Sequence, residues 1–140
     1  MAIKLSIEPF EKAIASLEEA LAAQSAEPGS SLIRDACIQR FEYTYELSHK
    51  MLRRFLEMTS ASPAEFDELS FQSLIRVADE RGLLLSDLTV WKAYRAARAA
   101  TSHTYDEKKA LEVFGIVPAF LEEARYLRDQ LLKHLADGAT

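Results

Sequence analysis

The feature that most constrains the fold is a run of 33 residues, from Ser30 to Ser62, that contains neither glycine nor proline. A single helix over this run would be about 50 Å long and would span a whole helical bundle. The composition also favours helices, because the chain contains 19 leucines and 21 alanines but only 4 valines. Straight or small side chains lose little rotamer freedom in a helix. The sequence therefore predicts an all-α protein with residues 30–62 as its central helix.

Two shorter helices are expected, one before and one after the central helix. The first runs from about Ile7 to Ala23, where apolar residues recur at three- and four-residue spacing. The second is expected to begin at Ser62-Pro63, a hydroxyl cap followed by a proline that needs no hydrogen bond. It is expected to end at Gly82, because glycine suits the left-handed residue that closes many helices.

The C-terminal part of the sequence predicts two more helices. Ser86 or Asp87 is expected to cap a helix that runs to about Ala100, and Asp106 is expected to cap the last helix. Pro118 lies inside the last pattern and is expected to kink or split it, because a proline ring collides with the carbonyl group four residues back.

These segments predict a single domain over residues 1–140, an antiparallel up-and-down four-helix bundle with an additional short helix. The four glycines are too dispersed for a phosphate-binding loop or a dinucleotide fingerprint. The single cysteine, Cys37, excludes an internal disulfide and fits a reducing compartment. We expect no metal and no cofactor, since no cluster has the spacing of metal ligands. We also expect a cytoplasmic protein without a membrane segment.

The densest group of polar residues, 98–107, lies where one helix is expected to end and the next to begin. Residues 92–109 carry five positive and two negative side chains, although the chain as a whole has a net charge of −5. Arg98 and His103 would point about 140° apart on a continuous helix, so they converge only if the helix ends near Ser102. A guanidinium and an imidazole placed together would bind a phosphodiester and move a proton. The alternative is a helix-ending Ser-His cap with a surface arginine.

Three stretches of the sequence carry a family resemblance: residues 40–52, Ser62-Pro63, and the segment Thr-Ser-His-Thr-Tyr-Asp-Glu at residues 101–107. Over about residues 5–135 the chain resembles the nucleotidyltransferase substrate-binding protein family, a branch of the HEPN group of helical bundles. The resemblance implies a bundle that dimerises and works beside a separately encoded minimal nucleotidyltransferase. The chain contains no Asp-x-Asp, which is part of the catalytic nucleotidyltransferase signature. The resemblance therefore implies the partner and not the transferase.

A second part of the resemblance concerns HEPN ribonuclease toxins, whose motif is an arginine, four to six residues, and then a histidine. Here Arg98 and His103 occupy these positions, and Tyr105 stands where a nucleotidyltransferase antitoxin adenylylates a tyrosine of such toxins. The leading hypothesis is a substrate-binding or regulatory partner subunit with Tyr105 as the adenylylation target. The alternative is a metal-independent ribonuclease toxin that uses Arg98 and His103. Both hypotheses expect Arg98, His103 and Tyr105 to share one concave pocket. Ala99 stands where such motifs usually carry a polar residue, which favours the partner.

Other residues are expected to contribute to a groove beside this segment. Tyr45 and His49 lie one helical turn apart and are expected to line the groove together with Thr101 and Ser102. A third hypothesis is a helical scaffold whose groove binds another helix. The expected partners are a minimal nucleotidyltransferase, a second copy in a homodimer, and a nucleotide or RNA. A core position is expected for Cys37 and a surface position for His134. Trp91 and Tyr94 are expected to pack in the core or in a dimer interface, with base stacking as the alternative.

Overall fold

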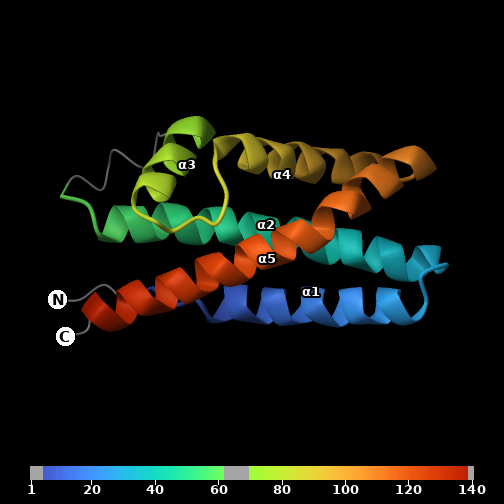
Figure 1. Cartoon of the computed structure of the whole chain (residues 1–140), viewed down its shortest axis with the longest axis horizontal. Coiled ribbons are helices and arrows are strands. Elements are labelled where there is room, and N and C mark those ends of the chain that lie inside the picture. Colours follow the sequence, from blue (N-terminus) through green and yellow to red (C-terminus); the bar gives the residue numbers. More distant parts are fainter. Residues whose placement is uncertain (1–4, 62–69, 139–140) are drawn as a thin grey trace.

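The computed structural model of the chain describes residues 5–61 and 70–138. Within these ranges the protein is all-α, and Figure 1 shows long helices that run in alternating directions with the short α3 beside them. This confirms the predicted helical bundle. The elements are α1 (Glu8–Ala26), α2 (Ser31–Met58), α3 (Phe71–Glu80), α4 (Leu88–Ala100), the 3₁₀ helix η2 (Thr101–His103) and α5 (Glu107–Gly138).

Side chains close to the helix ends explain where several helices begin and end. The Ser30 hydroxyl accepts a hydrogen bond from the Ile33 N–H at 3.1 Å and starts α2. The Asp87 carboxylate accepts one from the Val90 N–H at 3.2 Å and starts α4. Each side chain satisfies an amide group that has no partner within the helix. Gly82 follows α3 with a φ of 74°, which confirms the predicted left-handed cap.

The central helix ends at Met58, earlier than the absence of glycine and proline predicts. The Thr59 hydroxyl donates a hydrogen bond to the Phe55 carbonyl oxygen at 2.9 Å. The same hydroxyl accepts one, also at 2.9 Å, from the guanidinium of Arg81, which lies at the C-terminal end of α3. The end of α2 therefore combines a local hydrogen bond with a contact to α3, and the local sequence pattern does not contain the second.

Two further predicted boundaries concern α3 and α5. The predicted helix start at Ser62-Pro63 lies outside the described residues, and α3 begins at Phe71 with Ser70 as its cap. The last helix is not split, because α5 continues through Pro118. Figure 1 shows α5 changing direction between its orange N-terminal part and its red C-terminal part, as expected for a proline inside a helix.

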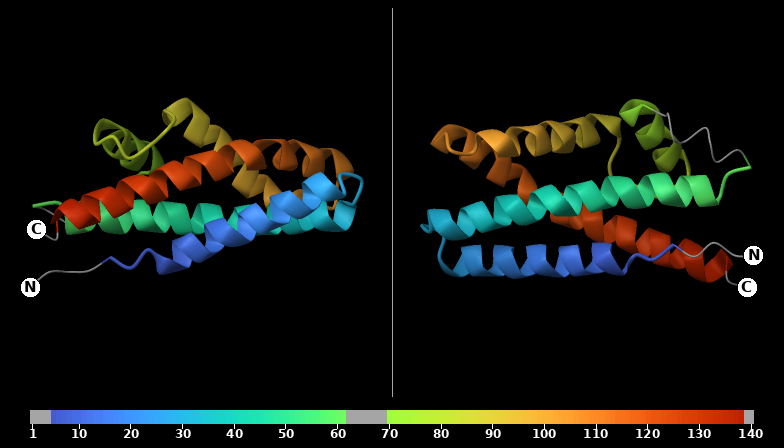
Figure 2. Two further views of the ribbon diagram at one scale, coloured as in Figure 1. Left: turned by 60° about the horizontal axis from the view of Figure 1, so that its bottom comes forward. Right: turned by 180° about the vertical axis from the view of Figure 1, so that it is seen from behind.

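The centre of the core is the fully buried ring of Phe120 on α5. Its centroid lies 5.2 Å from that of Phe41 and 5.9 Å from that of Tyr45, both on α2. On α4, Trp91 lies at 6.1 Å and Tyr94 at 5.1 Å, both with edge-to-face geometry. This aromatic hub joins three helices, while α1 packs against α2 and α5, as the two views in Figure 2 show. Cys37, Trp91 and Tyr94 are buried and His134 is exposed, as predicted.

Candidate functional site

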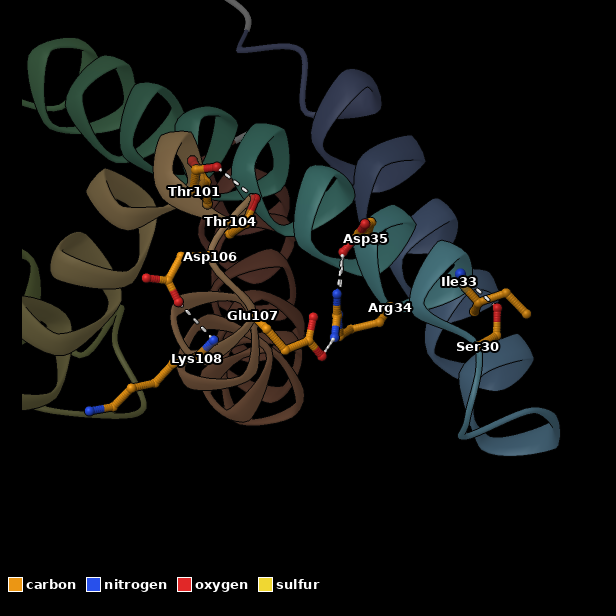
Figure 3. Close-up of polar contacts among 9 residues, drawn as sticks. All are labelled: Ser30, Ile33, Arg34, Asp35, Thr101, Thr104, Asp106, Glu107 and Lys108. Atoms are coloured by element: carbon orange, nitrogen blue, oxygen red, sulfur yellow. Dashed lines mark hydrogen bonds and ion pairs between the residues drawn. The ribbon is translucent and has the colours of Figure 1, made fainter.

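The polar segment around residues 98–107, which the sequence predicts as a functional site, forms a tight turn between α4 and α5. Helix α4 ends at Ala100 and η2 follows directly, so the helix stops as early as predicted. Thr101 Oγ1 donates a hydrogen bond to the Arg98 carbonyl oxygen at 2.7 Å, and Thr104 Oγ1 donates one to the Thr101 carbonyl oxygen at 3.1 Å. The Asp106 carboxylate then accepts the backbone N–H two residues further on at 2.9 Å, which confirms the predicted cap of α5 (Figure 3). The turn is thus held by its own side chains.

An ion pair attaches the far end of this turn to α2. Glu107 Oε1 lies 2.6 Å from Arg34 Nη1, and Asp35 Oδ1 lies 3.1 Å from Arg34 Nη2 (Figure 3). The hydrogen bond to Glu107 raises the pKa of Arg34, and the bond to Asp35 raises it further. The Arg34 side chain is 12% exposed and that of Glu107 is 70% exposed, so the contact joins the start of α5 to the start of α2 at the protein surface.

His103 and Tyr105 lie on the outside of the turn. Both side chains are exposed, and that of Tyr105 has an exposed fraction of 87%. Their ring centroids are 6.2 Å apart and the rings meet edge to face at 70°. The two groups therefore form an open pair, a phenol beside an imidazole, that another molecule can reach.

A pocket of about 400 Å³ lies between α2 and α4. Arg98 lines this pocket from α4, and Tyr45 and His49 line it from α2, in agreement with their spacing of one helical turn. We call this the α2–α4 pocket. Its other charged and aromatic lining residues are Glu46, Arg53, Phe71 and Arg95.

Arg98 is directed toward α2 by two carboxylates. Its Nε donates a hydrogen bond to Glu46 Oε1 at 2.6 Å, and its Nη2 lies 3.8 Å from Glu42 Oε1. His103 and Tyr105 are not among the residues that line the pocket. The expectation that these three side chains share one concave pocket is therefore wrong for a single copy of the chain. The reason is that two carboxylates one turn apart on α2 attract the guanidinium.

Thr101 and Ser102, also predicted for the groove, do not line the α2–α4 pocket. The Thr101 side chain is buried, and its hydroxyl bonds to the Arg98 carbonyl oxygen. Ser102 is exposed, and its hydroxyl donates to the Ala99 carbonyl oxygen at 3.2 Å. Both hydroxyls serve the local backbone where α4 ends, which keeps them out of the pocket.

The uncharged side of the pocket consists of aromatic rings. Burial lowers the pKa of His49, and the positive charge of Arg53 lowers it further, so the imidazole is neutral near pH 7. Burial raises the pKa of Tyr45 to about 12, so the phenol keeps its proton. The His49 and Phe71 rings are stacked with centroids 6.2 Å apart, and the Arg95 guanidinium lies 4.6 Å from the Phe71 centroid.

Sequence reasoning missed three residues that give the pocket its character: Arg53, Phe71 and Arg95. One signal was present, because His49 and Arg53 are four residues apart, and Arg95 lies three residues before Arg98. Such spacings place two side chains on the same face of a helix. Nothing in the local sequence, however, indicates that these two faces meet.

Side chains that could bind a metal ion are dispersed over the described part of the chain. Within residues 5–61 and 70–138, no three His, Cys, Asp or Glu side chains lie close enough together to hold a metal ion. None of the helices in these ranges is long and apolar enough to cross a membrane. Three arginines, Arg53, Arg95 and Arg98, gather at the α2–α4 pocket.

The fold and the turn together define a class of protein. It is an all-α bundle in which Arg98, His103 and Tyr105 lie shortly before the last helix, α5. Residues 5–133 match the model of the family described as nucleotidyltransferase substrate binding protein like. The chain belongs to this family. The match confirms the resemblance carried by the sequence motifs.

Relatives with names and solved structures agree with this assignment. The chain is 34% identical over 139 residues to a Haemophilus influenzae protein named probable ribonuclease HepT, and the match covers 94% of each chain. A solved Haemophilus influenzae structure, described as the fold of a substrate binding domain of a nucleotidyltransferase, is similar with a TM-score of 0.83 and 33% identity. That match covers 90% of this chain and 98% of the other. A solved Thermus thermophilus structure matches with a TM-score of 0.69 and 32% identity, covering 87% of this chain and 98% of the other.

Proposed function

We propose that this chain is the helical partner subunit of a separately encoded minimal nucleotidyltransferase, and that Tyr105 is the residue it presents to that enzyme. The observation that carries the proposal is the position of Tyr105, whose side chain is 87% exposed in a turn held by its own hydroxyl and carboxylate groups. A second protein can reach this phenol without unfolding the bundle. Membership of a family named for nucleotidyltransferase substrate binding supports the proposal.

The proposed reaction is an adenylyl transfer to the phenol. The Tyr105 oxygen attacks the α-phosphorus of ATP bound by the partner, a new P–O bond forms, and pyrophosphate leaves. The phenolic proton passes to a base. His103 is the base in the same turn, with its ring centroid 6.2 Å from that of Tyr105.

Co-expression with a minimal nucleotidyltransferase encoded beside this chain tests the proposal. We expect the two proteins to co-purify, and intact mass spectrometry after incubation with ATP to show one added adenylyl group on this chain. Peptide mapping should place the group on Tyr105, and Tyr105→Phe should abolish it. Tyr43→Phe is the matched control, because Tyr43 is also exposed but lies on α2. No complex, or a modification that survives Tyr105→Phe, would reject the proposal.

A second function, a metal-independent ribonuclease, is favoured by the similarity to the protein named probable ribonuclease HepT. In this function Arg98 stabilises the charge that develops on the phosphate, and His103 exchanges protons with the ribose 2′-hydroxyl. Because one copy of the chain keeps Arg98 and His103 in separate surroundings, this function needs either a movement of Arg98 or the second copy of a homodimer.

Expression of the chain alone separates the two functions. A ribonuclease would arrest growth and cleave RNA in the presence of EDTA, and His103→Ala would abolish both effects. Harmless expression together with intact RNA would remove this second function. Sedimentation analysis of the purified chain tests the expected homodimer.

A further inference from the structure

A small pocket lies at the end of the bundle that carries the turn with Tyr105. It has a volume of about 230 Å³, and it lies between the connection from α1 to α2 and the first turns of α5. We call it the α1–α5 pocket, and its lining includes Pro28, Arg34, Glu107, Leu111 and Phe114. We infer, on the basis of the proposed function, that the nucleotidyltransferase inserts an apolar side chain into this pocket and so holds the chain while Tyr105 reacts.

The pocket and Tyr105 lie at the same end of the molecule. Figures 1 and 2 show the connection between α1 and α2 at the end of the bundle where α5 begins. Glu107 lines the pocket and is two residues from Tyr105, so their Cα atoms are at most about 7.6 Å apart. Both residues of the Arg34–Glu107 ion pair belong to the pocket lining (Figure 3). An enzyme that reaches the Tyr105 hydroxyl therefore comes close to the α1–α5 pocket.

The most exposed apolar side chains gather at this end. In the described part of the chain, the three large apolar side chains with the highest exposed fractions are Tyr105 at 87%, Leu32 at 81% and Leu111 at 56%. Leu32 lies in the first turn of α2, and Leu111 lies near the start of α5. Leu111 also lines the pocket together with Phe114 and Pro28, so the apolar surface continues into it. Groups of exposed apolar side chains mark surfaces that another protein covers.

The volume of the pocket favours a protein side chain over a small-molecule ligand. Sites for small molecules usually have volumes of about 300–1,000 Å³, which is larger than the 230 Å³ of this pocket. Protein interfaces, in contrast, are anchored by a few side chains that fill pockets of the partner. The Tyr105 phenol alone cannot hold an enzyme, because a stable interface buries about 800 Å² on each partner. The pocket and the apolar side chains around it supply further contact area.

The charges around Tyr105 favour an enzyme that holds ATP over a second copy of this chain. The Asp106 carboxylate accepts the backbone N–H of Lys108 at 2.9 Å. The Glu107 carboxylate pairs with Arg34 at 2.6 Å. The Lys108 side chain is exposed and extends away from α5 (Figure 3). An enzyme that holds ATP brings a negatively charged triphosphate to this ammonium group, whereas a second copy brings the same positive charge.

Steady-state adenylylation by the nucleotidyltransferase encoded beside this chain tests the inference, with the concentration of the full chain varied at saturating ATP. Leu111→Asp is expected to raise KM for the chain at least about tenfold and to keep kcat within about twofold, because it removes a docking contact and not the reacting phenol. Gly29→Leu should act in the same way by filling the pocket. A Cβ atom at Gly29 meets no atom within 4 Å, so the fold accepts this variant. Leu132→Asp is the matched control, because Leu132 is 43% exposed near the other end of α5, and it should leave both constants unchanged.

The outcomes separate this inference from the proposed function. If the wild-type chain is adenylylated and neither Leu111→Asp nor Gly29→Leu raises KM, the inference is overturned and the proposed function stands. If the wild-type chain is not adenylylated, the proposed function falls and the inference falls with it. Sedimentation analysis tests the other occupant of the pocket. If Leu111→Asp converts a homodimer of the chain into monomers, a second copy covers the pocket, and this result also overturns the inference.

Discussion

Replacement of Phe120 by alanine is expected to lower the free energy of unfolding by about 4 kcal/mol. The ring is fully buried, and its centroid lies between 5.1 and 6.1 Å from the centroids of four other rings. Loss of a buried phenylalanine side chain costs about 3–5 kcal/mol, from the lost transfer free energy and the cavity left behind. The ring also loses its contacts with four other aromatic rings, and we expect a loss in the middle of that range, about 4 kcal/mol.

Urea unfolding, followed by circular dichroism and by Trp91 fluorescence, measures this change. Trp91 reports directly on the hub, because its ring lies 6.1 Å from that of Phe120. Leu32→Ala is the control, since Leu32 is 81% exposed and should lose less than about 0.5 kcal/mol. Phe120→Leu keeps most of the apolar volume and should lose about 1–2 kcal/mol, which stays measurable if the alanine variant does not fold. A loss below about 2 kcal/mol in Phe120→Ala would refute the idea that this ring holds α2, α4 and α5 together.

Three further predictions concern other parts of the bundle. Glu123 is fully buried and accepts the Leu85 N–H at 2.7 Å, so Glu123→Ala should cost about 1–3 kcal/mol in urea unfolding, and Glu123→Gln, which keeps an acceptor, should cost less. Burial lowers the pKa of His49 below 6.5, so the unfolded chain binds more protons in the window beneath that pH. Stability should therefore fall as the pH drops from about 7 to about 5.5, and less steeply in His49→Gln. Gly82→Ala should cost about 1–2 kcal/mol in thermal or urea unfolding, because a φ of 74° strains an alanine; an unchanged stability would contradict this reason.

The local sequence predicted the start of α4 and the end of α3, but it did not predict the end of α2. Asp87 and Gly82 act on backbone groups within a few residues of themselves, so their roles were predictable from the sequence. At the end of α2, Thr59 also bonds to Arg81, and the two residues are 22 positions apart in the chain. No pattern within residues 30–62 contains that contact, so the sequence set only an upper limit of 33 residues for this helix.

The residues of the candidate site also fall into two groups, those that the sequence named and those that only the structure showed. Spacing singled out Arg98 and His103 in one turn and Tyr45 and His49 on one helix face, whereas Tyr105 was named because of the family resemblance. The pocket residues Phe71 and Arg95 were not named, because they meet α2 only through packing of α3 and α4.

The sequence by itself determined that the chain forms long amphipathic helices and that Arg98, His103 and Tyr105 flank one short turn. Helical hydrogen bonds, caps and apolar periodicity all act between near neighbours, so these properties can be read residue by residue. Only the tertiary structure decided that Arg98 turns toward Glu46 and lines the same pocket as Arg53 on α2. That choice depends on the distance and angle at which α2 and α4 pack, and these are set by the aromatic core that joins helices far apart in the sequence.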